Sequence, residues 1–333
     1  MTGSVLAVDL GGTNLRVAVV SADGVVSHRR SLPTEAAAGP EAVADRIATL
    51  LEETATAAGM LADVPAGVAV PGPVEPHQGV VYFMPNLPGW RNFALGAALR
   101  RRTRRLIQIA NDGNCAALGE SRFGVGAGVR DLIYLALGTG VGGGIISDGR
   151  LIEGVSGVAG EVGHVTVALD GPRCTCGSIG CLEAFVSGWA ITREAKIIAT
   201  TDDGAAIRRA AAGKPITPTV IALAASDGDP AALALLDRAG RALGAGVGSF
   251  INLFNPELVV IGGGVATLGE ALMAPARRAL ASHTFPEQRA CARLVESALG
   301  DDTALYGAAA LAFGTANGPG TVQSDMSERR VNA

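Results

Sequence analysis

Three glycine clusters, each directly after a short apolar run, constrain the fold of this chain more than any other feature of its sequence. They are Asp-Leu-Gly-Gly-Thr-Asn at 9–14, the run at 138–144 and the triplet at 262–264. Glycine makes up 46 of the 333 residues, about twice its usual share, without the G-X-Y period of collagen. Because glycine permits positive φ and lets backbone N–H groups approach a ligand, the clusters predict tight turns at the ends of buried strands.

Apolar runs and stretches with helical spacing alternate along the chain. The predicted strands span 5–9, 15–20, 25–32, 66–70, 106–110, 132–137, 257–261 and 293–296. The predicted helices span 40–59, 94–101, 115–123, most of 183–254, one segment between the last two strands, and 304–313; residues 85–93 and 161–181 are predicted loops. A strand, a Gly/Thr turn and a second strand occur twice, at 9–16 and 137–146, which predicts two related α/β halves that face one cleft.

Two of the glycine clusters also carry a threonine, Thr13 or Thr139, whose hydroxyl adds a donor beside the backbone N–H groups. A single cluster is equally well explained as a tight turn, but three together favour phosphate binding. The sequence has no G-x-x-x-x-G-K-[ST] motif and no G-x-G-x-x-G between the first strand and a helix. A P-loop enzyme is therefore excluded, and a dinucleotide-binding dehydrogenase fits poorly.

Asn111 and Asp112 follow a predicted strand and precede a predicted helix. An aspartate at such a place is equally well explained as the N-cap of the helix. The functional alternative is a carboxylate on a rigid strand end that takes a proton from a substrate hydroxyl as this hydroxyl attacks a γ-phosphate. Asp9, at the first glycine cluster, is predicted to orient Mg²⁺ or its waters.

A histidine and three of the five cysteines lie close together in the sequence, with the pattern H-x9-C-x-C-x4-C. The cluster consists of His164, Cys174, Cys176 and Cys181. Gly177 and Gly180 permit the chain to fold back there, and three thiolates with one imidazole suit tetrahedral Zn²⁺. With four protein ligands and no open position, the predicted site is structural, and it is expected to hold the flanking Glu161 and Glu183 in place.

The overall composition excludes disorder as the main state, because 48% of residues are hydrophobic and 17% are charged. The net charge of −4 argues weakly against a nucleic-acid-binding protein. No apolar run is long enough for a membrane span, and no signal peptide precedes the first strand. We therefore expect a cytoplasmic protein, in which the isolated Cys115 and Cys291 are small core residues.

Five motifs together make the chain resemble the ROK family of bacterial sugar kinases and related repressors, and within it the glucokinase branch. The motifs are DLGGTN at 9–14, NDGN at 111–114, LGTGVGGG at 137–144, GEVGH at 160–164 and C-x-C-G-x-x-G-C-L-E at 174–183. The loop Pro85–Trp90 adds to the similarity, which runs from the first strand to about residue 315. Gly113 departs from the alanine common in the family, without consequence for these implications.

The resemblance implies an α/β, actin-like ATPase fold, also called ribonuclease-H-like, with an active-site cleft between two α/β domains. The small domain would contain 1–111 and about 303–316, and the large domain 112–302 with the zinc-binding loop. Residues 318–333 are expected to form a flexible tail.

The same resemblance implies a hexose kinase that uses ATP with Mg²⁺, forms glucose 6-phosphate and carries a structural Zn²⁺. Asp112 would be the catalytic base for the 6-hydroxyl. Sugar contacts are expected from Gly72, Asn111, Asp112, Glu161, His164 and Glu183, and less securely from Asn86. ATP or phosphate contacts are expected from Asp9, Gly11, Gly12, Thr13, Asn14, Gly138, Thr139, Gly140, Gly262, Gly263 and Gly264. His164 would bind zinc through one ring nitrogen and reach a sugar hydroxyl with the other.

Several alternatives stay open at this point. Mannose, fructose or an N-acetylhexosamine can replace glucose as the substrate, and polyphosphate can replace ATP as the donor. A sugar-responsive transcriptional regulator of the same family is the rival of another class, although the first strand begins too early for a preceding DNA-binding domain. The basic run 100–105 is expected to be a solvated helix end, and a homodimer or homotetramer is expected.

Overall fold

The computed structural model of the chain describes residues 3–85 and 87–316 and contains two five-stranded sheets. The first sheet has the order β3 (Val26–Pro33), β2 (Asn14–Ser21), β1 (Ser4–Leu10), β4 (Ala66–Val70) and β8 (Ile107–Asn111). The second has the order β11 (Arg150–Leu151), β10 (Val141–Ser147), β9 (Leu132–Leu137), β12 (Leu258–Gly262) and β13 (Arg293–Glu296). A small third sheet contains β5 (Val74–Glu75), β6 (Val80–Phe83) and β7 (Arg91–Phe93).

The two large sheets share one topology. In each, the first two strands in sequence pair antiparallel, and two later strands add in parallel to the first strand's other edge. The carboxyl ends of three parallel strands therefore meet at one edge of each sheet, which is where ligands bind in open α/β sheets. This arrangement confirms the prediction of two related α/β halves.

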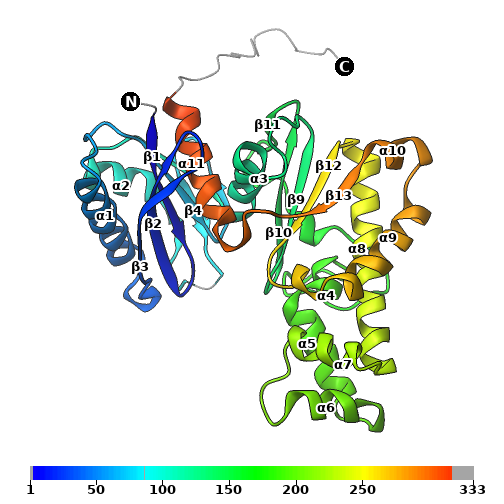
Figure 1. The fold of residues 1–333 in the computed structure, drawn as a ribbon. Helices are drawn as coiled ribbons and strands as arrows, with labels where there is room; N and C mark the ends of the chain where they lie inside the picture. Colours follow the sequence, from blue (N-terminus) through cyan, green and yellow to red (C-terminus); the bar gives the residue numbers. More distant parts are fainter. Residues whose placement is uncertain (1–2, 86, 317–333) are drawn as a thin grey trace, which may run out of the picture.

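Helices cover both faces of the two sheets (Figure 1). On the first sheet, α1 (Pro40–Ala57) and α2 (Leu95–Thr103) pack on one face and α11 (Thr303–Ala316) packs on the other. The helix α3 (Asp112–Phe123) lies between α11 and the second sheet. The remaining helices belong to the second half: α4 (Glu183–Val186), α5 (Gly188–Ile198), α6 (Ala205–Ala211), α7 (Pro218–Ser226), α8 (Pro230–Phe254), α9 (Glu270–His283) and α10 (Pro286–Cys291).

Two glycine contacts explain why α3 can lie so close to both neighbours. A Cβ atom at Gly307 of α11 would lie only 1.6 Å from the carbonyl oxygen of Cys115 on α3. A Cβ atom at Gly144 of β10 would lie 2.8 Å from the Cβ of Ala117 on the other side of the same helix. Larger residues at Gly307 or Gly144 would push α3 away from one sheet or the other.

The structure corrects several of the sequence predictions. Residues 142–144 lie within β10, so the second glycine cluster is a turn only at its start. The predicted loop 85–93 ends in the strand β7, the hairpin of β5 and β6 was not predicted, and two helices, α9 and α10, separate β12 from β13. Cys115 is buried as predicted, but Cys291 is exposed, because α10 buries none of its residues.

The basic run 100–105 is more engaged than the predicted solvated helix end. Arg105 is 3% exposed and pairs with Glu52, with its Nε 2.7 Å from Oε1. Arg102 pairs with Glu41 and Asp45 on α1. Two of the five arginines of this run are therefore paired with acidic residues of α1.

The domain boundaries remain a prediction. Asn86 and the predicted tail 318–333 lie outside the described residues. Within the described ranges, no helix is both long and apolar enough to cross a membrane.

Candidate active site

The carboxyl ends of β1, β4 and β8 bring the first group of predicted site residues together. Asp9 pairs in register with Ala69, and Ala69 pairs with Ala110, so the three strands end at one level. Asn111 then donates from Nδ2 to the carbonyl oxygen of Gly72 at 3.3 Å. The parallel sheet thus places Asp9, Gly72 and Asn111 along one edge.

Asn111, rather than Asp112, is the N-cap of α3. Its side-chain oxygen accepts hydrogen bonds from the backbone N–H groups of Gly113 at 2.8 Å and Asn114 at 3.4 Å. Asp112 is the first residue of the helix and is free of the capping role. The alternative interpretation of Asp112 as an N-cap is therefore wrong.

The carboxyl group of Asp112 has a pKa well above its usual value. Burial raises its pKa to about 6, and the negative charges of Asp9 and Glu161 act in the same direction. The backbone N–H of Gly113, 2.8 Å from Oδ1, opposes this rise. A carboxylate with such a pKa is ionised at pH 7 and still accepts a proton readily.

A pocket of about 40 Å³ lies beside this carboxylate. Its lining includes Asn111, Asp112, Asn114, Gly143, Gly160 and Glu161. Asn114 is 4% exposed, and its Oδ1 has no hydrogen-bond partner among the described residues. Since buried polar groups are normally paired, this oxygen indicates a place for a polar guest. Asn114 was not predicted as a site residue, although it belongs to the NDGN motif.

Glu161 and His164 connect this pocket to the cysteine cluster. The Nε2 atom of His164 lies 3.9 Å from Oε2 of Glu161, and its Nδ1 lies 3.8 Å from Sγ of Cys174. One nitrogen of the imidazole therefore lies near Glu161 and the other near the cysteines. The two roles expected for His164 stay a prediction.

The residues of the cysteine cluster fit a zinc ion. One ligand atom from each of His164, Cys174, Cys176 and Cys181 lies within 4.8 Å of the others. Sulfur atoms on a tetrahedral site with Zn–S of about 2.3 Å lie about 3.8 Å apart, and Sγ of Cys176 is 3.7 Å from Sγ of Cys181. That separation is far too long for a disulfide.

Local hydrogen bonding also prepares one of these cysteines for a metal. The backbone at Ser178 lowers the pKa of Cys176 to about 7, and the thiolate is the form that binds metal. The fold-back predicted at the glycines is present: Gly180 has φ +74°, and a Cβ there would lie 1.7 Å from the carbonyl oxygen of Ala168. We call His164, Cys174, Cys176 and Cys181 the Cys/His cluster.

Glu183 joins the Cys/His cluster to the second glycine turn. Its Oε1 accepts from Oγ1 of Thr175 at 3.1 Å and lies 3.4 Å from Sγ of Cys174. Its Oε2 accepts from the backbone N–H of Val141 at 2.9 Å. Glu183 is 7% exposed. Its carboxylate supports the second glycine turn through Val141 and also lies beside Cys174 of the Cys/His cluster.

The second and third glycine clusters lie together because β9 and β12 are adjacent parallel strands. The backbone N–H of Val265 donates to the carbonyl oxygen of Leu137 at 2.8 Å, and that of Gly188 donates to Gly138 at 2.8 Å. A Cβ at Gly138 or Gly264 would meet nothing within 4 Å, whereas one at Gly262 would lie 2.2 Å from the Tyr134 hydroxyl. Gly138 and Gly264 thus leave open space beside the chain, whereas packing against Tyr134 leaves no room for a side chain at Gly262.

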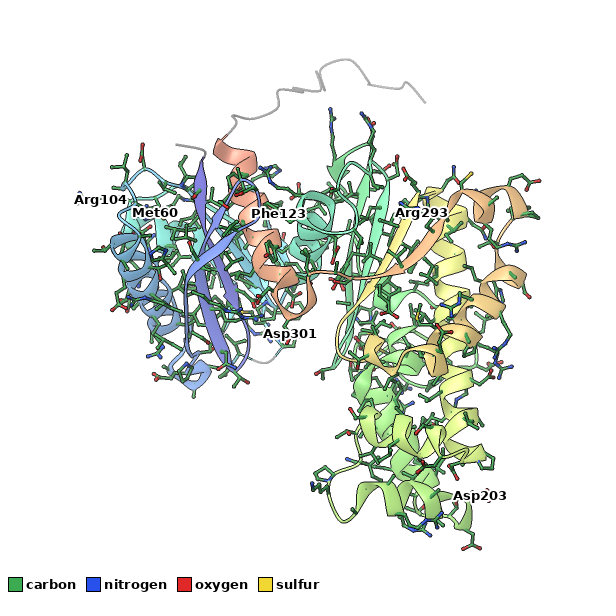
Figure 2. All side chains as sticks on the ribbon, in the orientation of Figure 1. Met60, Arg104, Phe123, Asp203, Arg293 and Asp301 are labelled. Atoms are coloured by element: carbon green, nitrogen blue, oxygen red, sulfur yellow. The ribbon has the colours of Figure 1, made fainter. Side chains whose placement is uncertain are left out.

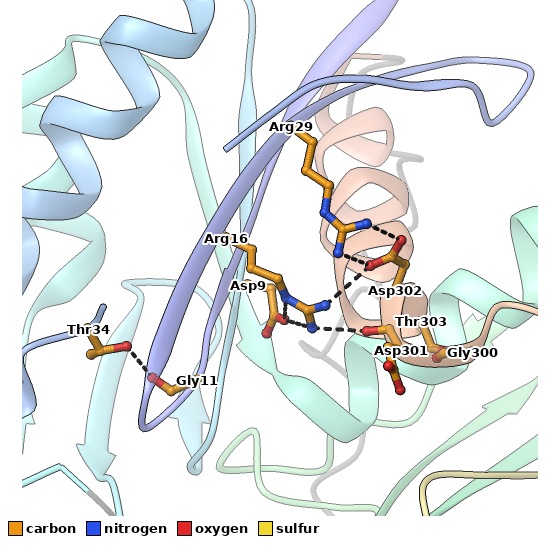
Figure 3. Close-up of polar contacts among 9 residues, drawn as sticks. All are labelled: Asp9, Gly11, Arg16, Arg29, Thr34, Gly300, Asp301, Asp302 and Thr303. Atoms are coloured by element: carbon orange, nitrogen blue, oxygen red, sulfur yellow. Dashed lines mark hydrogen bonds and ion pairs between the residues drawn. The ribbon is translucent and has the colours of Figure 1, made fainter. Parts of the chain in front are cut away.

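The first glycine turn is held from the side by Thr34, a residue that the sequence did not single out. Its Oγ1 donates to the carbonyl oxygen of Gly11 at 2.7 Å (Figure 3). Its backbone N–H donates to the carbonyl oxygen of Thr13 at 2.8 Å. Thr13 and Asn14 are exposed at the tip. No hydrogen bond or ion pair between described residues joins this turn directly to Gly138–Gly140.

Comparisons with known proteins agree with this geometry. The sequence model of the ROK family matches residues 5–314. A glucokinase of Thermotoga maritima is 37% identical over 92% of this chain and 96% of its own length. The structure of a ROK family glucokinase from Streptomyces griseus, in complex with glucose and AMPPNP, is 35% identical with a TM-score of 0.76, over 92% of this chain and 98% of that one. A xylose repressor of Caldicellulosiruptor bescii is 32% identical over 93% of this chain and 78% of its own length.

Proposed function

This chain belongs to the ROK family, and from that premise we propose that it is an ATP-dependent glucose kinase that forms glucose 6-phosphate. The observation that carries the proposal is the position of Asp112. Its carboxylate lies at the edge of the first sheet, lines the pocket beside Glu161, and has a pKa raised to about 6. The similarity to glucokinases supplies the choice of glucose.

In the proposed reaction, Asp112 accepts the proton of the sugar 6-hydroxyl as its oxygen attacks the γ-phosphate. The O–P bond forms while the bond to the leaving ADP breaks, and the proton remains on Asp112 until it passes to solvent. A pocket of about 40 Å³ holds about three water-sized groups. It therefore suits the CH2–OH arm of a hexose, with the ring outside it.

The remaining residues have positioning roles in this proposal. Gly72, Asn111, Glu161, His164 and Glu183 provide acceptors and donors for the other sugar hydroxyls. The phosphates of ATP bind at the first turn, through Gly11, Gly12, Thr13 and Asn14, and at the second and third clusters, through Gly138, Thr139, Gly140, Gly262, Gly263 and Gly264. Backbone N–H groups and threonine hydroxyls are suitable donors for phosphate oxygens.

Two metals complete the proposed site. Mg²⁺ neutralises charge on the phosphates when bound, and Asp9 orients it or its waters. The Cys/His cluster would hold Zn²⁺, which would fix the ring of His164 and the start of α4, where Glu183 lies. The cytoplasmic location and the dimer or tetramer remain predictions.

The proposal is tested by measuring ADP release in a coupled assay over a panel of hexoses. The panel contains glucose, mannose, fructose, N-acetylglucosamine and N-acetylmannosamine, each with ATP, and a parallel series measures sugar phosphate with polyphosphate as donor. We expect the highest kcat/KM for glucose with ATP. A higher kcat/KM for another sugar would identify that sugar as the substrate in place of glucose. No turnover with any sugar would contradict the proposed kinase activity.

A further inference from the structure

The face of the first sheet that α11 covers changes from apolar to charged at one end. Its apolar part includes Val5, Ala7, Ala18 and Val20, packed against Leu305, Ala308, Ala309 and Ala312 of α11. In the register of β1 with β2, Val5 pairs with Val20 and Ala7 with Ala18. The next pair on this face is Asp9 with Arg16. Directly opposed cross-strand residues have their side chains side by side.

Arg16 uses its whole guanidinium group at this place. Its Nε lies 2.9 Å from Oδ2 of Asp9, and its Nη2 contacts the same oxygen. The Nη1 atom lies 3.2 Å from Oδ1 of Asp302, and Nη2 also donates to the carbonyl oxygen of Asp301 at 2.9 Å. Asp301 and Asp302 form the turn that leads into α11, so one side chain joins β1 to the start of this helix (Figure 3).

A second arginine shares only the α11 side of this bridge. Arg29 donates from Nη1 and Nη2 to the two oxygens of Asp302 at 2.8 and 2.7 Å and has no hydrogen bond to Asp9. Its side chain is 46% exposed, against 23% for Arg16. Arg29 is therefore a natural control, because it binds the same carboxylate from the same sheet without reaching β1's aspartate.

The two hydrogen bonds from Arg16 fall on one oxygen of Asp9. Oδ1 of Asp9 is left without a hydrogen-bond partner among the described residues, and the side chain is 11% exposed. A carboxylate fixed through one oxygen presents the other in a defined direction. The turn Gly11–Asn14 follows Asp9 directly, so whatever orients Asp9 also orients the start of this turn.

From this geometry we propose that Arg16 is a positioning residue for nucleotide binding. It holds Asp9 and the first glycine turn against the N-terminal end of α11, and so fixes the Asp9 carboxylate that faces the Mg²⁺-bound phosphates. The inference rests on the proposed kinase function for the identity of the ligand. Lysine cannot replace this arginine, because a single ammonium does not span Asp9, Asp302 and a carbonyl in one plane.

The test compares Arg16→Gln, Arg16→Lys, Asp302→Asn and the control Arg29→Gln. Equilibrium binding of Mg²⁺·AMPPNP is measured by calorimetry, alongside KM for ATP, KM for glucose and thermal stability. We expect Arg16→Gln to weaken nucleotide binding by about 30-fold, since charged hydrogen bonds are lost. Arg16→Lys and Asp302→Asn should each weaken it by about fivefold or more, and Arg29→Gln should stay within about threefold.

Three results would overturn the inference. They are equal weakening by Arg16→Gln and Arg29→Gln, an equal rise of the glucose and ATP KM values in Arg16→Gln, or a fall in thermal stability with unchanged nucleotide binding. If Arg16→Gln does not fold, unchanged binding in both Arg16→Lys and Asp302→Asn overturns it. Wild-type protein that binds Mg²⁺·AMPPNP but phosphorylates no sugar contradicts the proposed function alone, because the binding comparison of the variants still applies.

Discussion

The first turn, at Gly11–Asn14, and the second, at Gly138–Gly140, occupy the same place in two sheets of one topology, but they are supported by different chemistry. The residue two positions before the first glycine is Asp9 in one half and Ala136 in the other. Arg16 and α11 hold the first turn through ion pairs. Glu183 and the Cys/His cluster hold the second turn through a hydrogen bond to Val141.

The two halves therefore share an architecture but differ in the groups at their corresponding edges. In the first half, the carboxyl ends of the strands carry or lead into two acidic side chains, Asp9 and Asp112. In the second half, the corresponding edge is glycine backbone, and its acid is Glu183, the first residue of α4 after the Cys/His cluster. Figure 2 shows Asp301, next to the start of α11, between the two halves, where the ion pairs of the first turn end. Charge is thus concentrated on one side of the proposed phosphate site.

The largest expected effect comes from Asp112, the acid that begins α3 directly after the last strand of the first sheet. Asp112→Asn removes the base and should lower kcat by about 1,000-fold. The variant should be at least as stable at pH 7, since the pKa of Asp112 is raised to about 6 in the folded state and its ionised form costs stability above that pH. Steady-state kinetics and thermal unfolding measure both. The matched control is Glu296→Gln, at the exposed end of β13, and activity of Asp112→Asn within tenfold of wild type would exclude the base.

The second prediction tests the acid that only the first turn has. Asp9→Asn keeps the size of the side chain but removes its charge, and should lower kcat/KM for ATP by about 100-fold with a much smaller change for glucose. The control is Asp301→Asn, because Asp301 contacts Arg16 only through its backbone carbonyl. If both variants behave like wild type, Asp9 has no role in nucleotide binding and the two turns do not differ in this way.

The third prediction concerns the support of the second turn. Cys176→Ser should remove the metal, lower the melting temperature, and reduce kcat/KM for glucose by about 10- to 100-fold, as loss of a metal's ligands or their partners typically does. Metal analysis of the purified wild type should give about one zinc per chain. Cys291→Ser, at an exposed cysteine outside the Cys/His cluster, should change none of these. Wild-type protein without zinc, with Cys176→Ser fully stable and active, would refute the site.

The fourth prediction distinguishes two kinds of glycine in the second cluster. One kind leaves room for a ligand, and the other allows close packing within the protein. Gly138→Ala should raise KM for ATP by about tenfold at unchanged stability, because its Cβ meets no protein atom within 4 Å. Gly143→Ala should cost about 1–3 kcal/mol of stability, because its Cβ would lie 2.3 Å from the carbonyl oxygen of Tyr134. Calorimetric unfolding measures the stability of the two variants, and steady-state kinetics measures their KM for ATP. A destabilised Gly138→Ala with normal KM would mean that both glycines serve the fold.

The same comparison explains which parts of the molecule the sequence could predict. Strand and helix positions followed from local spacing, and the repeated strand–turn–strand pattern correctly indicated two similar halves. The predicted extent of the second turn was wrong, because Gly142, Gly143 and Gly144 belong to β10. Gly144 packs against α3, and such packing between separate segments has no local signal. The pairing of Arg16 with Asp302 spans most of the chain and has no local signal.

The site residues show the same limit. Spacing was enough to gather His164 and the cysteines into one cluster, since all four lie within one short loop. It was not enough to tell Asn111 from Asp112 as the helix cap, which depends on the backbone geometry of one residue. The bridge from Glu183 to Val141 and the unpaired oxygen of Asn114 also became visible only in three dimensions.

The smallest expected effect is a shift in pH dependence, and it compares the two turns through their influence on the base. Asp112 must be ionised to accept a proton, so kcat/KM for glucose should fall as the pH drops through about 6. Burial is the main cause of that pKa, followed by the charge of Asp9, with a smaller contribution from Glu161, while Gly113 and Asn111 oppose it. Asp9→Asn should therefore move this acid limb to lower pH, by about half a unit. Glu183→Gln should leave it in place, because Glu183 is not among the groups that shift Asp112. If the fall of kcat/KM at low pH shifted in Glu183→Gln and not in Asp9→Asn, the charge that influences Asp112 would come from the second turn and not from the first.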